Sequence, residues 1–204
     1  MIQMQLSTAA QMLAAEHIGA DVVFRGVSTD TRSLQQGNLF VALTGPNFDG
    51  HHFVSEAAAK GAAAALVSQR VEASLPQLTV AHTHQGLGQL AAGWRAQFSL
   101  PVIGVTGSNG KTTVKEMIAA ILSQSGPMVV TQGNFNNDIG VPLTLFQIDS
   151  KHRYAVIEMG ANHLGEIAYL THLARPTIAL ITNAGPAHLE GFGSLEGVAH
   201  GKGA

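Results

Sequence analysis

The stretch of sequence that decides the fold is Val102-Ile103-Gly104-Val105-Thr106-Gly107-Ser108-Asn109-Gly110-Lys111-Thr112-Thr113. It begins with an apolar run, continues through a segment rich in glycine and ends on Lys-Thr-Thr, which opens a stretch of helical periodicity. A buried strand, a glycine-rich turn and a helix in this order are typical of a phosphate-binding loop. The stretch therefore predicts a parallel α/β domain that binds a phosphorylated ligand.

The chemistry of this loop suits a nucleoside triphosphate. Glycine lets backbone N–H groups turn towards phosphate oxygens, and the start of the following helix adds partial positive charge. Lys111 is expected against the β- and γ-phosphates, and the Thr112 hydroxyl on Mg²⁺. The strict Walker spacing would place a glycine where this chain has Val105, so the loop is a G-x-x-G-x-x-G-K-T variant. A turn that binds nothing is the alternative, but the strand before the loop and the helix after it favour phosphate binding.

Strands and helices alternate regularly on both sides of the loop. The pattern predicts strands over residues 102–106, 128–131, 154–158 and 177–182, and helices over 85–98, 112–123 and 165–173. Buried strands that alternate with helices indicate a parallel sheet covered by helices on both faces.

The N-terminal part has shorter and less regular elements. A helix capped by Ser7 is predicted over residues 7–18, strands over 22–27, 37–43, 62–67 and 78–81, and a second helix over 53–60 that stops at Gly61. The overall expectation is α/β: a small mixed α/β domain over residues 1–83, followed by a truncated P-loop-type parallel-sheet ATPase domain over residues 84–204.

The amino-acid composition limits the kinds of molecule that the chain is expected to bind. Among 204 residues, 12% are charged, the formal net charge is −2 and there is no cysteine. The chain therefore lacks the basic surface of a nucleic-acid-binding protein, and it can form no disulfide. No apolar run approaches the roughly 18 residues that a membrane helix needs, and the N-terminus does not resemble a secretory signal. Small-molecule ligands and a cytoplasmic location are expected, and the oligomeric state stays open.

Three downstream positions add candidate ligands. Glu158 ends a predicted strand, where an acid can bind Mg²⁺ or be an ordinary strand-end carboxylate. Residues 134–142 form a polar turn that includes Asn137, and its amides can orient phosphates or metal-bound water or only cap the next helix. His188 follows the strand over residues 177–182 and is either a ligand or a surface residue. The other histidines have no metal-binding spacing, and surface positions are expected for most of them.

Several motifs, in order along nearly the whole chain, resemble the Mur ligases of bacterial peptidoglycan synthesis. They are Ser28-Thr29-Asp30-Thr31-Arg32, Gly37-Asn38-Leu39-Phe40-Val41-Ala42-Leu43, Asp49-Gly50-His51, the loop from Thr106 to Thr113, Asn136-Asn137-Asp138-Ile139-Gly140-Val141-Pro142, Glu158-Met159-Gly160-Ala161-Asn162-His163 and Ala187-His188-Leu189-Glu190-Gly191-Phe192-Gly193. Within the family, the likeness is greatest to members that join D-alanyl-D-alanine to UDP-N-acetylmuramoyl tripeptide.

This resemblance implies an N-terminal domain that binds the UDP end of the substrate and a central domain that binds ATP and Mg²⁺. In the family, ATP phosphorylates the terminal carboxylate of the peptide, and the amine of D-alanyl-D-alanine attacks the acyl phosphate to form an amide. A bare carboxylate is a poor acyl donor, so attaching a phosphate leaving group makes chemical sense of the loop.

The resemblance also assigns roles to residues. It implies that Lys111, Glu158, His188 and Lys202 are catalytic, and that Mg²⁺ binds Thr112, Glu158, His188 and Lys202, the lysine as a carbamate. ATP is expected on Gly107, Ser108, Asn109, Gly110, Lys111, Thr112, Thr113 and Asn137. The UDP-muramoyl substrate is expected on Thr31, Arg32, Gly45, Asp49, His51, Asn162 and His163.

The chain departs from the family pattern at its end. The family has the form A-K-G-E and continues, whereas this sequence reads His200-Gly201-Lys202-Gly203-Ala204. Gly201 and Ala204 are expected to weaken the helix that presents Lys202. The chain is therefore expected to be the N-terminal part of such a ligase, inactive alone. Two alternatives stay open: a fragment that only binds nucleotide or UDP-sugar, and a ligase similar to folylpolyglutamate synthetase, in which the loop typically continues Lys-Gly-Ser.

Overall fold

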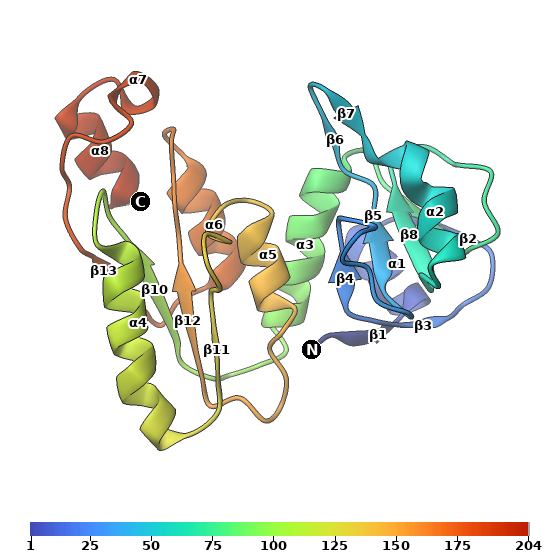
Figure 1. Ribbon diagram of the computed structural model, residues 1–204, viewed down its shortest axis with the longest axis horizontal. Helices are drawn as coiled ribbons and strands as arrows, with labels where there is room; N and C mark the ends of the chain where they lie inside the picture. The colour runs from blue at the N-terminus through green and yellow to red at the C-terminus, as the bar shows by residue number, and fades with distance from the viewer. Residues whose placement is uncertain (204) are drawn as a thin grey trace. The chain divides into compact units, whose positions relative to one another are not determined.

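The computed structural model describes residues 1–203, shown in Figure 1. Contacts along the chain divide it into two compact units, Met1–Trp94 and Arg95–Ala204. Each unit has its own sheet. Both predicted architectures, a mixed α/β unit followed by a parallel α/β unit, are confirmed.

The first unit is built on a five-stranded sheet. Its order is β2 (Glu16–Ile18), β9 (Gln77–Thr79), β8 (Ala64–Val67), β5 (Leu39–Val41) and β4 (Val27–Ser28), with only β2 antiparallel to its neighbour. Two antiparallel pairs accompany it: β1 (Gln3–Gln5) with β3 (Val23–Arg25), and β6 (Thr44–Gly45) with β7 (Phe48–Asp49).

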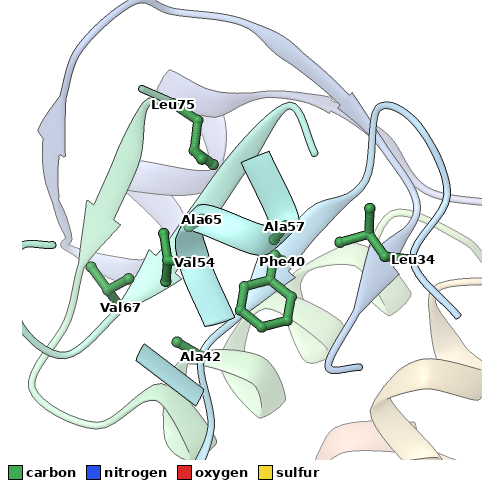
Figure 2. Packing of buried hydrophobic residues seen from close by; sticks show 8 residues of the cluster. All are labelled: Leu34, Phe40, Ala42, Val54, Ala57, Ala65, Val67 and Leu75. Atoms are coloured by element: carbon green, nitrogen blue, oxygen red, sulfur yellow. The ribbon is translucent and has the colours of Figure 1, made fainter. Parts of the chain in front are cut away.

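Helices and the sheet enclose the core of this unit. The helical elements are α1 (Leu6–Leu13), η1 (Gly50–Phe53), α2 (Val54–Ala59) and α3 (Thr83–Arg95). Figure 2 shows apolar side chains of α2, of strands β5 and β8 and of the adjoining loops packed together: Leu34, Phe40, Ala42, Val54, Ala57, Ala65, Val67 and Leu75. Burying this apolar surface stabilises the sheet whose loops carry the residues predicted to bind substrate.

The prediction of one helix over residues 7–18 is wrong in its second half. Helix α1 ends at Leu13 because Ala14 adopts a left-handed conformation with φ +48°. Residues Glu16–Ile18 instead form β2 and pair with β9. Ser7 is not the cap: its N–H and hydroxyl both donate to the Asp21 carboxylate, at 2.8 Å each.

The second unit is a four-stranded parallel sheet with the order β11 (Met128–Val130), β12 (Tyr154–Glu158), β10 (Val102–Thr106) and β13 (Ile178–Ile181). Its helical elements are α4 (Lys111–Leu122), η2 (Ser123–Ser125), α5 (Gly140–Leu145) and α6 (Glu166–Ala174). Figure 1 shows α4 on one side of the sheet and α5 and α6 on the other, as predicted. Ile103, Val105 and Val156 form the core beneath α4.

Strand β13 is exposed, although a buried strand was predicted there. It pairs with β10 at one edge of the sheet, and Ile178, Leu180 and Ile181 are 56%, 40% and 46% exposed. An edge position explains why these apolar side chains keep their contact with solvent. Among residues 1–203, no helix is both long enough and apolar enough to cross a bilayer.

Two short helices, α7 (Leu189–Phe192) and α8 (Leu195–Lys202), complete the described chain. The helix that carries Lys202 forms, the predicted weakening by Gly201 stays a prediction, and the glycines of α8 have a packing role. A Cβ at Gly201 would lie 2.7 Å from the Phe192 ring, and one at Gly197 would lie 2.0 Å from the Phe192 carbonyl oxygen. Ala204, the other position in that prediction, lies outside the described residues.

Candidate functional site

The phosphate loop leaves β10 and enters α4 through two positions that require glycine. Gly107 has φ +143° and Gly110 has φ +78°, both in the region that favours glycine. A Cβ at Gly107 would also lie 2.0 Å from Thr182 Oγ1. The loop therefore packs directly against the segment that follows β13.

That segment holds the loop through side chains. Asn109 N–H donates to Asn183 Oδ1 at 3.2 Å, and Asn183 Nδ2 donates to the Asn109 carbonyl at 3.0 Å. Thr182 Oγ1 donates to the same carbonyl at 2.6 Å. Ser108 Oγ donates to the Gly185 carbonyl at 2.8 Å. We call this set of contacts the Asn183 clamp. Sequence analysis placed no functional role on Asn183, because its partners are more than seventy positions away.

The Asn183 clamp uses some backbone N–H groups of the loop and leaves others available to a ligand. Ser108 N–H donates to the Asn183 carbonyl at 3.0 Å, so the N–H groups of Ser108 and Asn109 are both engaged within the protein. The first intrahelical donor of α4 is Val114, which leaves the N–H groups of Lys111, Thr112 and Thr113 without helical partners. Lys111 Nζ donates to the Gly107 carbonyl at 2.8 Å and so lies over the loop. The groups left for a predicted anion are therefore the N–H groups at the start of α4 and the Lys111 side chain.

Glu158 lies at the same edge of the sheet as the loop, since it is paired with Val105 of β10. Its carboxylate is 1% exposed. Asn136 Nδ2 donates to Oε1 at 2.8 Å, whereas Oε2 is buried with no hydrogen-bond partner. A buried charged oxygen without a partner is costly, so Oε2 is suited to a ligand with positive charge.

Lys115 provides a positive charge beside Glu158. It is fully buried, and its Nζ donates to the Thr131 carbonyl at 2.7 Å and pairs with Glu116 Oε1 at 2.8 Å. Its distance to Glu158 Oε2 is 3.9 Å, beyond a hydrogen bond. Lys115 therefore compensates part of the carboxylate charge without occupying Oε2. Sequence analysis missed Lys115, and it did not single out Asn136 among the amides of its turn.

The predicted ATP ligands on α4 and α5 occupy different environments. Thr112 and Thr113 are exposed in the first turn of α4. Asn137 Oδ1 accepts from Gly140 N–H at 2.8 Å and therefore caps α5. The neighbouring Asn136, not Asn137, is the amide that contacts Glu158.

Three predicted residues line one pocket. Asn162, His163 and His188 surround a volume of about 480 Å³, together with residues of α7. The Glu166 carboxylate accepts from Asn162 N–H at 2.7 Å and from His163 Nδ1 at 3.1 Å. Burial raises the pKa of Glu166, but these hydrogen bonds outweigh it and the net pKa is lowered. Glu166 thus fixes the Asn162–His163 turn as an ionised carboxylate.

Lys202 at the end of α8 is 2% exposed, and its Nζ lies 5.2 Å from the centroid of the Phe192 ring. Burial lowers the pKa of Lys202, and repulsion from Lys111 lowers it further. The structure thereby brings Lys202 within electrostatic reach of the phosphate-loop lysine. A lowered pKa increases the neutral amine that reacts with carbon dioxide to form a carbamate.

The predicted substrate residues Thr31 and Arg32 follow β4. Arg32 Nη2 pairs with Asp30 Oδ2 at 2.6 Å, and the Arg32 side chain is 88% exposed. Hydrogen bonds from the Arg32 side chain lower the pKa of Asp30 to about 2. Thr31 is buried, and its carbonyl accepts from Lys60 Nζ at 3.0 Å. The ionised Asp30 carboxylate therefore holds the Arg32 side chain in a position exposed to solvent.

The other predicted substrate residues, Gly45, Asp49 and His51, belong to β6, β7 and η1. His51 is buried, contrary to the surface position expected for most histidines. Ser68 N–H donates to its Nε2 at 2.9 Å, so the proton is on Nδ1, which donates to Asp49 Oδ1 at 2.5 Å. Backbone and side-chain hydrogen bonds from His51 lower the pKa of Asp49. His51 therefore anchors its loop to the end of β8.

The predicted Mg²⁺ site contains buried oxygen atoms that have no hydrogen-bond partner, as an ion that prefers oxygen ligands would need. Glu158 Oε2 is a hard oxygen ligand with no partner, and Thr106 Oγ1 is a second buried oxygen without one. Among residues 1–203 there is no group of three or more His, Cys, Asp or Glu side chains arranged for a metal ion. The predicted set of Thr112, Glu158, His188 and Lys202 contains only two such side chains.

Two family models match the chain. Residues 105–204 match the Mur ligase middle domain, and residues 23–95 match the catalytic domain of the Mur ligase family. Together they cover most of both units described above.

Two relatives that share one enzyme name are similar to this chain over its whole length. UDP-N-acetylmuramoyl-tripeptide--D-alanyl-D-alanine ligase of Escherichia coli is 54% identical over 100% of this chain and 45% of its own length. The corresponding ligase of Haemophilus influenzae is 49% identical, with 100% and 46% covered. The chain thus spans somewhat less than half the length of these relatives.

Solved structures agree with the sequence comparison. A crystal structure of MurF from Acinetobacter baumannii superimposes with a TM-score of 0.94 at 40% identity, covering 98% of this chain and 45% of that one. MurF ligase from Thermotoga maritima, solved in complex with ADP, gives a TM-score of 0.80 at 36% identity, covering 87% and 42%.

Proposed function

The chain belongs to the Mur ligase family, and from this membership we propose that it carries the nucleotide site and substrate-binding residues of an ATP-dependent amide ligase. The proposed reaction joins D-alanyl-D-alanine to UDP-N-acetylmuramoyl tripeptide in peptidoglycan synthesis, as the names of the relatives indicate for those proteins. We also propose a cytoplasmic location.

The observation that carries this proposal is the open carboxylate oxygen of Glu158 beside the phosphate loop. Lys111 and the start of α4 provide positive charge for the phosphates, and Glu158 Oε2 provides a ligand for a cation that accompanies them. In the proposed chemistry, the terminal carboxylate of the tripeptide takes the γ-phosphoryl group. The amine of D-alanyl-D-alanine then attacks the acyl carbon, phosphate leaves and an amide forms.

The residues of the second unit divide this work. Lys111 orients the phosphates, Asn136 holds Glu158 in place while Lys115 compensates part of its charge, and Asn162 and His163 offer their pocket to the muramoyl peptide. Mg²⁺, when bound, neutralises charge on the transferred phosphoryl group. Thr112, Glu158, His188 and a carbamate on Lys202 are its proposed ligands.

The test is binding and product formation by the same chain. ATP with Mg²⁺ and UDP-N-acetylmuramoyl tripeptide should each bind in calorimetry, and failure of both would contradict the proposal. Because the chain spans 45% of the Escherichia coli relative, we propose that it binds both ligands without making the amide. Amide product above that of a Lys111→Ala control would overturn this last point and show that these residues suffice for catalysis.

A further inference from the structure

We propose that Lys115 is a positioning residue that keeps a free divalent cation away from Glu158 and so restricts cation binding there to the metal–nucleotide complex. The inference rests on the proposed function, in which a cation reaches Glu158 together with ATP. Lys115 lies in α4, about one turn after the phosphate-loop Lys111, and its side chain is fully buried. Its charge therefore acts inside the protein, where solvent screens it little.

Two oxygen atoms hold the Lys115 ammonium group in place. Its Nζ donates to the Thr131 carbonyl at 2.7 Å and pairs with Glu116 Oε1 at 2.8 Å. The Glu116 side chain is 65% exposed, so solvent weakens that ion pair. The Thr131 carbonyl is therefore the buried acceptor that fixes Lys115.

Thr131 also sets the spacing between Lys115 and Glu158. Thr131 follows β11 directly, is fully buried, and its Oγ1 accepts from Glu158 N–H at 3.0 Å. This residue thus binds the ammonium group through its carbonyl and the Glu158 backbone through its hydroxyl. The resulting 3.9 Å between Lys115 Nζ and Glu158 Oε2 is too long for a hydrogen bond but short enough for strong electrostatic interaction.

The charges of the two buried side chains cancel. Glu158 contributes one negative charge and Lys115 one positive charge, and their side chains are 2% and 0% exposed. A free divalent cation at Oε2 would be attracted by the carboxylate and repelled by the ammonium group close by. The phosphates of ATP add negative charge, so a cation that arrives with them meets a favourable balance. Lys115 therefore makes Glu158 a ligand for the metal–nucleotide complex and a poor one for the free ion.

The experiment measures binding of Mn²⁺, a paramagnetic substitute for Mg²⁺, to the full chain without nucleotide. Electron paramagnetic resonance reports the free ion. Lys115→Met removes the charge and keeps an unbranched side chain, and it should tighten Mn²⁺ binding about tenfold or more. A residue with a purely structural role would not give tighter binding when it is replaced. Lys151→Met, at an exposed position, is the matched control and should leave Mn²⁺ affinity unchanged.

A double variant tests whether the gain acts through Glu158. Lys115→Met leaves the Glu158 carboxylate buried without its countercharge, so its melting temperature should fall, and Mn²⁺ should raise it more than in the unsubstituted chain. Lys115→Met combined with Glu158→Gln removes both charges. This double variant should regain stability and bind Mn²⁺ no better than the unsubstituted chain.

The Mn²⁺ measurements need no nucleotide, so they separate this proposal from the proposed function. Equal Mn²⁺ affinity in Lys115→Met and the unsubstituted chain would overturn the role of Lys115 and leave the proposed function standing. A gain that persists in the double variant, or a Lys115→Met chain that stays unfolded in Mn²⁺, would overturn it as well. Absence of ATP binding by the unsubstituted chain in Mn²⁺ would instead overturn the proposed function.

Discussion

Asn136 donates a hydrogen bond of 2.8 Å to Oε1 of Glu158 and leaves Oε2 of the same carboxylate buried and unpartnered. One oxygen is thus used to fix the side chain, and the other is held open. This division of roles suits the proposal that Glu158 binds a cation that accompanies ATP, with Lys115 Nζ 3.9 Å from Oε2 as the nearest positive charge.

Glu158→Gln should remove the Mg²⁺-dependent part of ATP binding. The amide can still accept from Asn136, but it has no negative charge for the metal. We expect ATP affinity in excess Mg²⁺ to fall about tenfold or more, with little change in EDTA. Calorimetry in both buffers measures this difference. Glu116→Gln, which alters an exposed partner of Lys115, is the control and should show no such loss.

Lys111→Ala should weaken ATP binding in the presence and absence of Mg²⁺. The side chain supplies a charge-assisted contact to phosphate, whose loss is expected to cost about 1.5–3 kcal/mol. Lys151→Ala provides an exposed lysine control outside the loop. Unchanged ATP affinity in Lys111→Ala would count against the assignment of the phosphate loop.

Substitutions of Asn183 should act on ATP binding through the loop. Asn183→Ala removes both side-chain bonds to Asn109, and Asn183→Asp keeps the acceptor but loses the donor and adds negative charge near the phosphates. We expect ATP affinity in the order unsubstituted chain, Ala, Asp. Amide exchange of Asn109 measured by NMR should accelerate in the alanine variant. Slow exchange there would show that the side chain does not hold the loop.

The ion pair of Asp30 and Arg32 should be visible in an acid titration. The pKa of Asp30 is lowered to about 2, below the ordinary 3.8, so its ionised form stabilises the fold above pH 3.8. This contribution decreases as the pH falls towards 2. Carbon-13 NMR of the carboxyl group should show a midpoint near 2, and Arg32→Met should move it towards 3.8. A midpoint that does not move would exclude Arg32 as the cause.

Gly197→Ala should destabilise the α7–α8 segment, although alanine favours helix. The new Cβ would lie 2.0 Å from a backbone oxygen of Phe192, which cannot rotate away as a side chain can. Such overpacking is expected to cost about 1–3 kcal/mol. Hydrogen exchange over residues 195–202 should become faster, whereas Ala199→Ser, at an exposed position of the same helix, should have little effect.

The sequence predicted the elements whose signals are local. Strands β10 and β12 have the predicted boundaries, because an apolar run bounded by glycine or proline indicates a buried strand without distant information. The N-terminal helix was extended too far for the opposite reason. Residues 16–18 become a strand through pairing with β9, about sixty positions later, which overrides local helical periodicity.

In the candidate site, too, the sequence predicts only those residues whose signals are local. The loop lysine and Glu158 could be found from spacing and strand position. The choice between Asn136 and Asn137 could not, because both are amides in one polar turn and only the fold turns Asn136 towards Glu158. Lys115 reads as an ordinary helix lysine until the sheet buries it.

The Asn183 clamp has a consequence for synthesis of the protein. When a ribosome has released the chain only as far as β12, the complete loop sequence from Gly107 to Lys111 is already outside, but the groups that bind Ser108 and Asn109 have not yet emerged. The loop proposed to bind nucleotide therefore acquires its shape late, after residues 182–185 emerge. Until then, the proposed ATP site is not formed and a ligand bound there could not stabilise the nascent domain.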